Sequence, residues 1–306
     1  MITKLKDTVV CLLTGAGQVM FQKNALSGLL FIVGIFWGAC ECGMPHVGWG
    51  ALVGLVVSTL AGNLMEPHRA DDRDAGLWGF NGILAGCALP TFLGHGALMW
   101  VALVVCAALT SVMRKVMNLG MARYGINSLT APFVASTWII LLAAQQLGAL
   151  SPAPAAAASA TLPGAWAVAA WWLKGISQVF LVDSWVTGAI FLVALAVSSW
   201  KSALWAAASS AIALGVAWLY QADSAAIAAG LYGFSPVLTG IAVGCVFGRS
   251  GWRQVALGVA AVVVTVFVQA AMNALFVPFG LPTLTAPFCL VTWLFLFLQV
   301  DVEGGK

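Results

Sequence analysis

The amino-acid sequence repeats itself across the middle of the chain, and this repeat constrains the fold more than any other feature. Residues 117–133 match residues 272–288 at eight of seventeen positions, and both stretches end in Leu-Thr-Ala-Pro-Phe. Residues 76–86 match residues 230–240 in the same way. The separations of 155 and 154 residues agree to within a short loop insertion. The chain is therefore a duplicated half-protein, with repeats far too long for a solenoid or a propeller.

The composition places this duplicated chain in a membrane. Hydrophobic residues make up 62% of the 306 residues and charged residues only 8%, whereas soluble domains average about 25% charged residues. So few charges cannot cover a surface that faces water on all sides. The densest charge run, Glu66–Asp74, is expected to form a loop at the water boundary. The net charge of +3 is small and scattered, so no nucleic-acid partner is expected.

Apolar segments of about 20 residues are long enough to cross a bilayer as helices. The sequence predicts an all-α polytopic membrane protein with full crossings at 47–65, 97–113, 129–147, 165–182, 202–220, 255–276 and 284–300. Other segments are too short or too rich in glycine and proline to cross fully: 77–93, 231–247 and those around 26–37 and 187–200. The predicted organisation is a first repeat half at 1–150, a low-complexity linker at 151–163 and a second repeat half at 164–306.

Interrupted apolar segments at matching positions of two halves are typical of a transport site at the interface between repeats. Non-helical backbone at membrane depth is tolerated only where protein buries it or where it lines a wet cavity. The repeated Thr-Ala-Pro sequences at Thr130 and Thr285 fit helices that begin within the membrane, with threonine as the cap and proline in the first turn. The alternative is a proline kink in a continuous helix. Because the motif occurs twice in the same surroundings, the helix start is favoured.

A third matching pair places one glutamine in an apolar stretch of each half, Gln18 and Gln178, 160 residues apart. A buried amide needs hydrogen-bond partners, so each glutamine either holds helices together or binds a polar solute. Thr130 and Thr285 offer hydroxyl oxygens at a second repeated position. These four side chains are the polar candidates for a pathway between the halves.

Each half also carries a phenylalanine and a leucine four positions apart, Phe80 with Leu84 and Phe234 with Leu238. Residues at that spacing share one helix face, so each pair makes an apolar strip. A single strip of this kind usually packs in a core. Two strips that face each other across a pseudo-twofold axis would form a flat slot that admits a small planar solute and excludes hydrated ions.

Taken together, these motifs resemble those of the urea transporter family, in its bacterial and animal branches. The resemblance rests on the Gly-x-x-Gln-Val pattern at the first glutamine, the Gly-Leu-Trp-Gly-Phe and Gly-Leu-Tyr-Gly-Phe elements, and the repeated Leu-Thr-Ala-Pro-Phe. It covers nearly the whole chain. It implies two inverted halves, each with five spanning helices and one tilted, partly spanning helix, and a pore between the halves. It also implies a homotrimer in the cell inner (cytoplasmic) membrane, surrounded by lipid, with one urea pore in each subunit.

The resemblance assigns roles to individual side chains. Gln18 and Gln178 would bind urea in two vestibules, where Phe21 and Val179 add apolar contacts. The narrow centre would lie at Thr130 and Thr285, with Leu84 and Leu238 on its flat walls and Phe80 and Phe234 on the same strips. The second half departs from the family pattern at two places. Gln178 stands where the family can carry an acidic residue, and Ser235-Pro236 stands where the first half has Asn81-Gly82.

The expected function is passive, channel-like transport of urea, because urea is neutral and planar and selectivity can rest on pore shape and hydrogen-bonding pattern. The alternatives are a channel for another small neutral solute, for ammonia or for water, and a proton-coupled carrier of urea or amides. Paired pore histidines and paired Asn-Pro-Ala motifs, which ammonium channels and aquaporins would need, do not occur. A proton-coupled carrier would need Glu41 or Asp183 to titrate. Both lie near segment ends, where a boundary or packing role is expected.

No enzymatic activity, metal site or cofactor is expected. The apolar segments contain no His-Glu-x-x-His motif and no serine, histidine or aspartate constellation. The seven cysteines show no metal-binding spacing and are expected to be buried as small hydrophobic residues. An odd number of crossings in each half would place both chain ends on one side, and Lys4 and Lys6 favour the cytoplasmic side.

Overall fold

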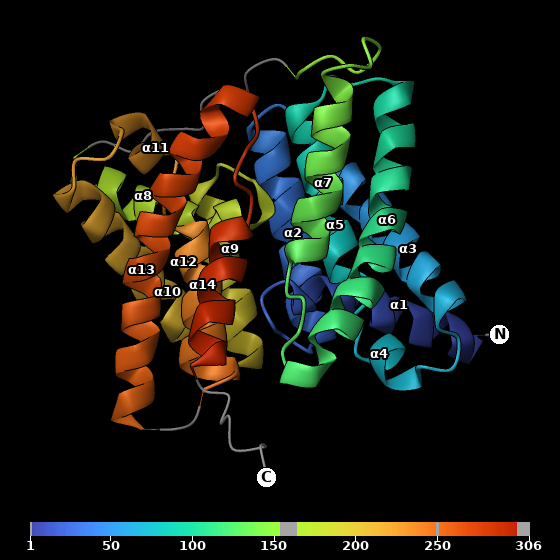
Figure 1. Ribbon diagram of the computed structural model, residues 1–306, viewed down its shortest axis with the longest axis horizontal. Coiled ribbons are helices and arrows are strands. Elements are labelled where there is room, and N and C mark those ends of the chain that lie inside the picture. The colour runs from blue at the N-terminus through green and yellow to red at the C-terminus, as the bar shows by residue number, and fades with distance from the viewer. Residues whose placement is uncertain (1, 154–163, 249–250, 299–306) are drawn as a thin grey trace.

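The computed structural model describes residues 2–153, 164–248 and 251–298, and in these ranges the chain forms helices and no β-strand (Figure 1). The predicted all-α class is therefore confirmed. The single β-type pairing among the described residues is an isolated bridge between Leu93 and Pro152. Most of the predicted linker at 151–163 lies outside the described residues, so the predicted half boundaries stay predictions.

The order of helices repeats along the chain. The first half contains α1 (Ile2–Gln18), α2 (Ala25–Glu41), α3 (Pro45–Met65), α4 (Ala70–Asp74), α5 (Phe80–Phe92), α6 (Ala97–Met121), η1 (Ala122–Tyr124) and α7 (Ala131–Ala144). The second half contains α8 (Ala165–Ser177), η2 (Gln178–Phe180), α9 (Trp185–Ser198), α10 (Trp200–Leu219), α11 (Ser224–Ala228), α12 (Phe234–Ile241), η3 (Ala242–Val246), α13 (Trp252–Phe276), η4 (Val277–Phe279) and α14 (Ala286–Phe297). Each helix of the first half has a counterpart at the same place in the second, down to the five-residue helices α4 and α11.

Four helices are long and apolar enough to cross a membrane: α3, α6 with η1, α10, and α13 with η4. Helices α8 and α9 pass the same test together, although the chain bends by 72° between them, which gives up to five candidate spans in the described residues. Five apolar helices are shorter: α2, α5, α7, α12 with η3, and α14. The predicted short, interrupted segments at 77–93 and 231–247 are thus confirmed as the short helices α5 and α12.

Helices α7 and α14 are shorter than the full crossings predicted at 129–147 and 284–300. The cause lies in the residue before each threonine, because Leu129 and Leu284 have left-handed backbone angles, with φ of 53° and 50°. This conformation interrupts a right-handed helix, so the helices begin at Ala131 and Ala286. Their 14 and 12 residues fall short of the roughly 20 that a full crossing needs.

The prediction that proline stands in the first turn of these helices is confirmed. The prediction that the threonine hydroxyls cap the helices is wrong. Thr130 and Thr285 occupy the N-cap positions, but neither side chain accepts a hydrogen bond from the first turn. Their hydroxyls have a different partner, described below.

The two halves meet mainly through α2 and α9, which lie side by side in the centre of the molecule, with α1–α7 on one side and α8–α14 on the other (Figure 1). The rings of Phe31 and Phe191 pack edge to face with centroids 5.1 Å apart. Two buried side-chain hydroxyls also cross this interface. Ser27 Oγ donates to the carbonyl of Ala194 at 2.6 Å, and Thr187 Oγ1 donates to the carbonyl of Gly34 at 2.8 Å. Packing and paired polar groups therefore join the halves into one core.

Candidate functional site

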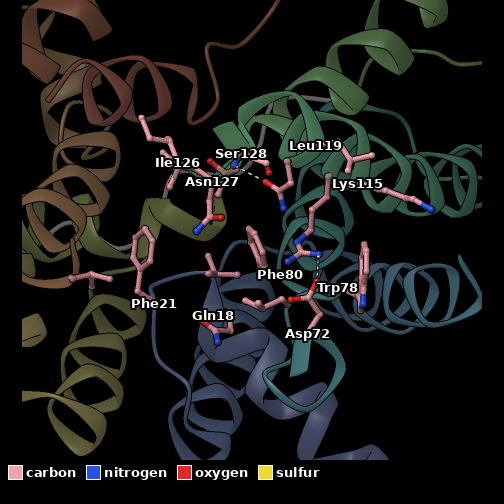
Figure 2. Close-up of a pocket in the computed structure, with 18 of the residues that line it drawn as sticks. Gln18, Phe21, Asp72, Trp78, Phe80, Lys115, Leu119, Ile126, Asn127 and Ser128 are labelled. Carbon is pink, nitrogen blue, oxygen red and sulfur yellow. Dashed lines mark hydrogen bonds and ion pairs between the residues drawn. The ribbon is translucent and has the colours of Figure 1, made fainter. Parts of the chain in front are cut away.

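A cavity of about 550 Å³ is lined by residues of α1, α4 and α6 and extends to Thr130 at the start of α7 (Figure 2). Four predicted site residues line it: Gln18, Phe21, Phe80 and Thr130. The remaining lining is mostly from the first half, but Val246, Phe247 and Phe288 come from the second. The cavity therefore reaches the boundary between the halves.

Gln18 ends α1 and is tied to the turn that follows α4. Its amide Nε2 donates to the carbonyl of Ala75 at 2.9 Å. This turn lies against α1 because Gly76 has φ of 68°, and a Cβ on that residue would stand 2.4 Å from the amide nitrogen of Gly15. Within the described residues no group donates to Oε1 of Gln18, which leaves this oxygen as an acceptor at the cavity wall. The glutamine thus both connects helices and offers a polar group to a solute.

Apolar rings complete this part of the wall. Phe21 lies in the turn after α1 with a left-handed φ of 62°. Its ring packs edge-on against Phe247 and Phe288 of the second half, with centroids 5.6 Å and 6.2 Å away. Phe80, at the first position of α5, faces the same cavity (Figure 2). A planar solute in the cavity would therefore meet aromatic surface beside the glutamine acceptor.

At the inner end of the cavity, the two repeated threonines touch. Thr130 Oγ1 and Thr285 Oγ1 are 2.6 Å apart and share a hydrogen bond across the boundary between the halves. The thiol of Cys289 lies 3.3 Å from the Thr130 hydroxyl. Both threonines are almost fully buried, and the hydroxyl pair occupies the space between the helix starts. A solute that continued past this point would have to separate the two hydroxyls.

Leu84 and Leu238 are fully buried in the main hydrophobic core. Neither side chain lines the cavity. The two leucines predicted as pore walls are therefore covered by neighbouring side chains.

The second half reproduces the glutamine geometry. Gln178 Nε2 donates to the carbonyl of Ala229 at 2.9 Å, and the next residue, Gly230, has φ of 72°. Phe234 is half-buried, like Phe80. Val179, by contrast, is fully buried in the main core. None of these three predicted residues lines the 550 Å³ cavity of the first half.

The mouth of the cavity carries charged side chains that sequence reasoning missed. Lys115 Nζ lies 2.6 Å from Glu66 Oε1, and Arg114 Nη1 lies 3.2 Å from Asp72 Oδ2. The guanidinium of Arg114 also stacks over the ring of Trp78, 4.4 Å from its centroid. The hydrogen bond from Lys115 holds the pKa of the Glu66 carboxyl below its ordinary value. The run Glu66–Asp74 is thus partly helical and part of the cavity wall, where only a solvated loop was expected.

A signal for this network exists in the sequence. Arg114 and Lys115 interrupt the otherwise apolar α6, and a cation within a membrane helix needs a partner. Glu41 and Asp183, two carboxylates outside the cavity, also have partners. Glu41 Oε2 accepts a hydrogen bond from Ser184 Oγ at 2.6 Å, and Lys174 Nζ lies 2.9 Å from Asp183 Oδ1. The expected packing role of Glu41 and Asp183 agrees with these contacts.

Comparison with known proteins identifies the family to which the chain belongs. Residues 9–300 match the family model described as urea transporter. The chain belongs to the urea transporter family. It is similar to proteins named urea transporter 1 from Ovis aries, at 30% identity over 296 residues, which covers 94% of this chain and 76% of the relative. The relatives from Rattus norvegicus and Mus musculus are also 30% identical, over 97% and 96% of this chain and 80% and 79% of their own lengths.

Membership in the urea transporter family confirms the resemblance seen in the repeated motifs. It also agrees with the expectation that the chain is not an enzyme, because the family consists of transporters. Among the described residues, no three histidine, cysteine, aspartate or glutamate side chains are grouped so that they could hold a metal ion.

Proposed function

We propose that this urea transporter family member carries urea passively, through a channel-like pathway of its own in each subunit. The cavity between Gln18 and the Thr130–Thr285 pair supports this proposal most directly. Urea has four N–H donors around one carbonyl acceptor. The free Oε1 of Gln18 and the threonine hydroxyls are acceptors at two successive depths, and the rings of Phe21 and Phe80 offer flat apolar surface between them.

When urea passes the Thr130–Thr285 pair, the hydrogen bond between the two hydroxyls would be replaced by hydrogen bonds to urea. In the absence of solute the hydroxyls of Thr130 and Thr285 bond to each other, so neither leaves a buried polar group unsatisfied. A urea molecule would separate them and offer its own N–H and carbonyl groups in return. Leu84 and Leu238, which are buried in the main hydrophobic core, would hold the planar molecule from its faces. A hydrated cation would find no charge at the centre to replace its water.

The halves would be inverted repeats with the pore between them. Reciprocal contacts support this arrangement: Trp138 Nε1 donates to the carbonyl of Pro282 at 2.8 Å, and its counterpart Trp293 donates to the carbonyl of Asn127 at 3.0 Å. Contacts that are exchanged between equivalent positions are typical of twofold symmetry. Helices α6 and α13 run in opposite directions in Figure 1, as an axis in the membrane plane requires.

By the same symmetry, Gln178 and Phe234 would form the vestibule on the other side of the membrane, with Val179 packed behind them. Urea would be the substrate, and lipid would cover the apolar outer helices. The proposed assembly is a homotrimer in the cell inner (cytoplasmic) membrane, with a complete pathway in each subunit and both chain ends on the cytoplasmic side.

Urea flux into liposomes that contain the purified protein tests the proposal. We expect rapid urea entry when no ion or proton gradient is imposed. In liposomes with an imposed proton gradient, we expect the same urea entry rate before and after an ionophore removes that gradient. Entry that requires a proton gradient would instead identify a proton-coupled carrier. Fast entry of ammonia or water without urea would identify one of the other channel types. Protein-free liposomes give the background rate.

A further inference from the structure

Arg114 is a cation buried within the longest helix of the first half. Its side chain is only 7% exposed and pairs with Asp72 on one side, while its guanidinium stacks on Trp78 on the other. A buried arginine is costly unless it is paired and hydrogen-bonded. Both partners belong to the segment that follows α3, so this one side chain connects α6 to the α4 region.

The two partners of Arg114 flank the turn that holds Gln18. The carbonyl of Asp72 accepts a hydrogen bond from the amide of Leu77 at 2.9 Å, which closes the turn around Ala75. Helix α4 has only five residues, and so short a helix is not stable by itself. Its position therefore depends on side-chain contacts, among which the Arg114–Asp72 pair is the most buried ion pair. The carbonyl of Ala75 can hold the Gln18 amide only if this turn stays in place.

We propose that Arg114 is a positioning residue for the urea pathway. Through Asp72 and Trp78 it fixes the turn after α4, so that the Ala75 carbonyl holds Nε2 of Gln18 and leaves Oε1 free to accept from the solute. Arg114 also lines the cavity, but the role proposed here is exerted through Gln18. This inference rests on the proposed urea transport, and the experiment below separates the two.

The second half of the chain serves as an internal comparison. Gln178 makes the same 2.9 Å bond to Ala229, yet the position equivalent to Arg114 is Gln269. Gln269 bonds to Thr283 and Asn273 instead of the α11 segment. There Asp223 caps α11, and its carboxylate accepts from the amide of Ala226 at 2.8 Å. The bond from the glutamine amide to the turn can therefore form without an equivalent of the Arg114–Asp72 ion pair. Among the described residues, an ion pair at this position occurs in the first half and not in the second.

The test measures how urea flux into liposomes saturates with urea concentration. We expect Arg114→Gln and Asp72→Asn each to raise the half-saturating urea concentration about 2- to 10-fold. This factor corresponds to the net free energy of one neutral hydrogen bond. Arg114→Lys keeps the charge and should raise it less. The matched control is Arg123→Gln, which removes a positive charge from an exposed arginine whose contact is the ring of Tyr124. It should leave half-saturation unchanged.

The decisive comparison repeats these substitutions in a Gln18→Leu background. If Arg114 acts through Gln18, Arg114→Gln adds no further rise there, because the acceptor that it positions is already gone. An undiminished rise in that background would overturn the inference and indicate either direct contact between Arg114 and urea or a general structural role. Absence of saturable urea flux in the unaltered protein would instead refute the proposed function. Elution of each variant as the unaltered assembly checks folding, and Asp72→Asn carries the same comparison if Arg114→Gln does not fold.

Discussion

At the scale of single residues, the contact between Thr130 and Thr285 leads to the sharpest prediction about the pathway. Replacing either threonine with valine keeps its volume and removes the hydroxyl, so a passing urea molecule loses one acceptor. An unmade buried hydrogen bond costs about 1–3 kcal/mol, so urea permeability should fall about 5- to 150-fold if this point limits flux. Stopped-flow measurements on liposomes would record the change.

Helix α14, which begins after Thr285, provides a matched control for this prediction. Thr292 is fully buried in α14, and its hydroxyl has no hydrogen-bond partner among the described residues. Thr292→Val should therefore fold normally and conduct urea at the unaltered rate. If Thr130→Val and Thr285→Val conducted as well as this control, the threonine pair would not lie on the pathway.

The residue scale also shows what sequence could and could not predict about the site. Repetition identified Gln18 and Thr130, because a polar residue that recurs in an apolar stretch needs a reason in both copies. The charges at Asp72 and Arg114 were missed because they are not repeated and because a charge run usually faces water. The bond between the two threonine hydroxyls could not be predicted either, because it depends on how closely the halves approach.

At the scale of elements, the turn after α4 depends on one glycine. Gly76 combines a left-handed φ of 68° with close approach to Gly15, and a Cβ there would lie 2.4 Å from that backbone nitrogen. Gly125 has a similar φ of 65° with nothing within 4 Å of its Cβ position. Gly125→Ala should therefore cost about 1–2 kcal/mol for its backbone conformation. Gly76→Ala should cost about 1–3 kcal/mol more, because the added methyl overpacks the contact.

Thermal unfolding of the two variants in detergent would compare these costs, with the lower midpoint expected for Gly76→Ala. The Gln18 bond to Ala75 belongs to the same turn, so Gly76→Ala should also weaken urea flux. Equal midpoints for the two variants would contradict the close packing of this turn against α1.

The sequence predicted the kinds of element better than their lengths. Glycine, proline and the repeat correctly indicated the short helices α5 and α12 and the helix starts after Thr130 and Thr285. The shortness of α7 and α14 was missed, because nothing in the residue type of Leu129 or Leu284 predicts a left-handed backbone. The bend after α8 has the same origin, since Leu181 has φ of 57°. Such conformations are imposed by tertiary packing, which a periodic apolar pattern does not record.

At the scale of the whole molecule, the proposed assembly makes a direct prediction. Many large apolar side chains are exposed on the described helices, and lipid or neighbouring subunits must cover them. We expect native mass spectrometry in mild detergent to show a species of three subunits. Because each subunit would hold a complete pathway, trimers that mix unaltered and Thr285→Val subunits should conduct in proportion to the unaltered fraction. A steeper loss would mean that the pathway is shared between subunits.

The inverted arrangement of the halves predicts which face of the membrane equivalent residues reach. Arg123 and Pro278 occupy equivalent positions just before Tyr124 and Phe279, and both are exposed. A twofold axis in the membrane plane sends equivalent positions to opposite faces. Single cysteines introduced at the two positions, in a background without the seven native cysteines, should react with a membrane-impermeant thiol reagent from opposite sides of sealed vesicles. Reaction of both from one side would mean that the axis lies along the membrane normal, and the pore between inverted halves would have to be abandoned. Urea flux by the cysteine-free background would show that the labelled protein is folded.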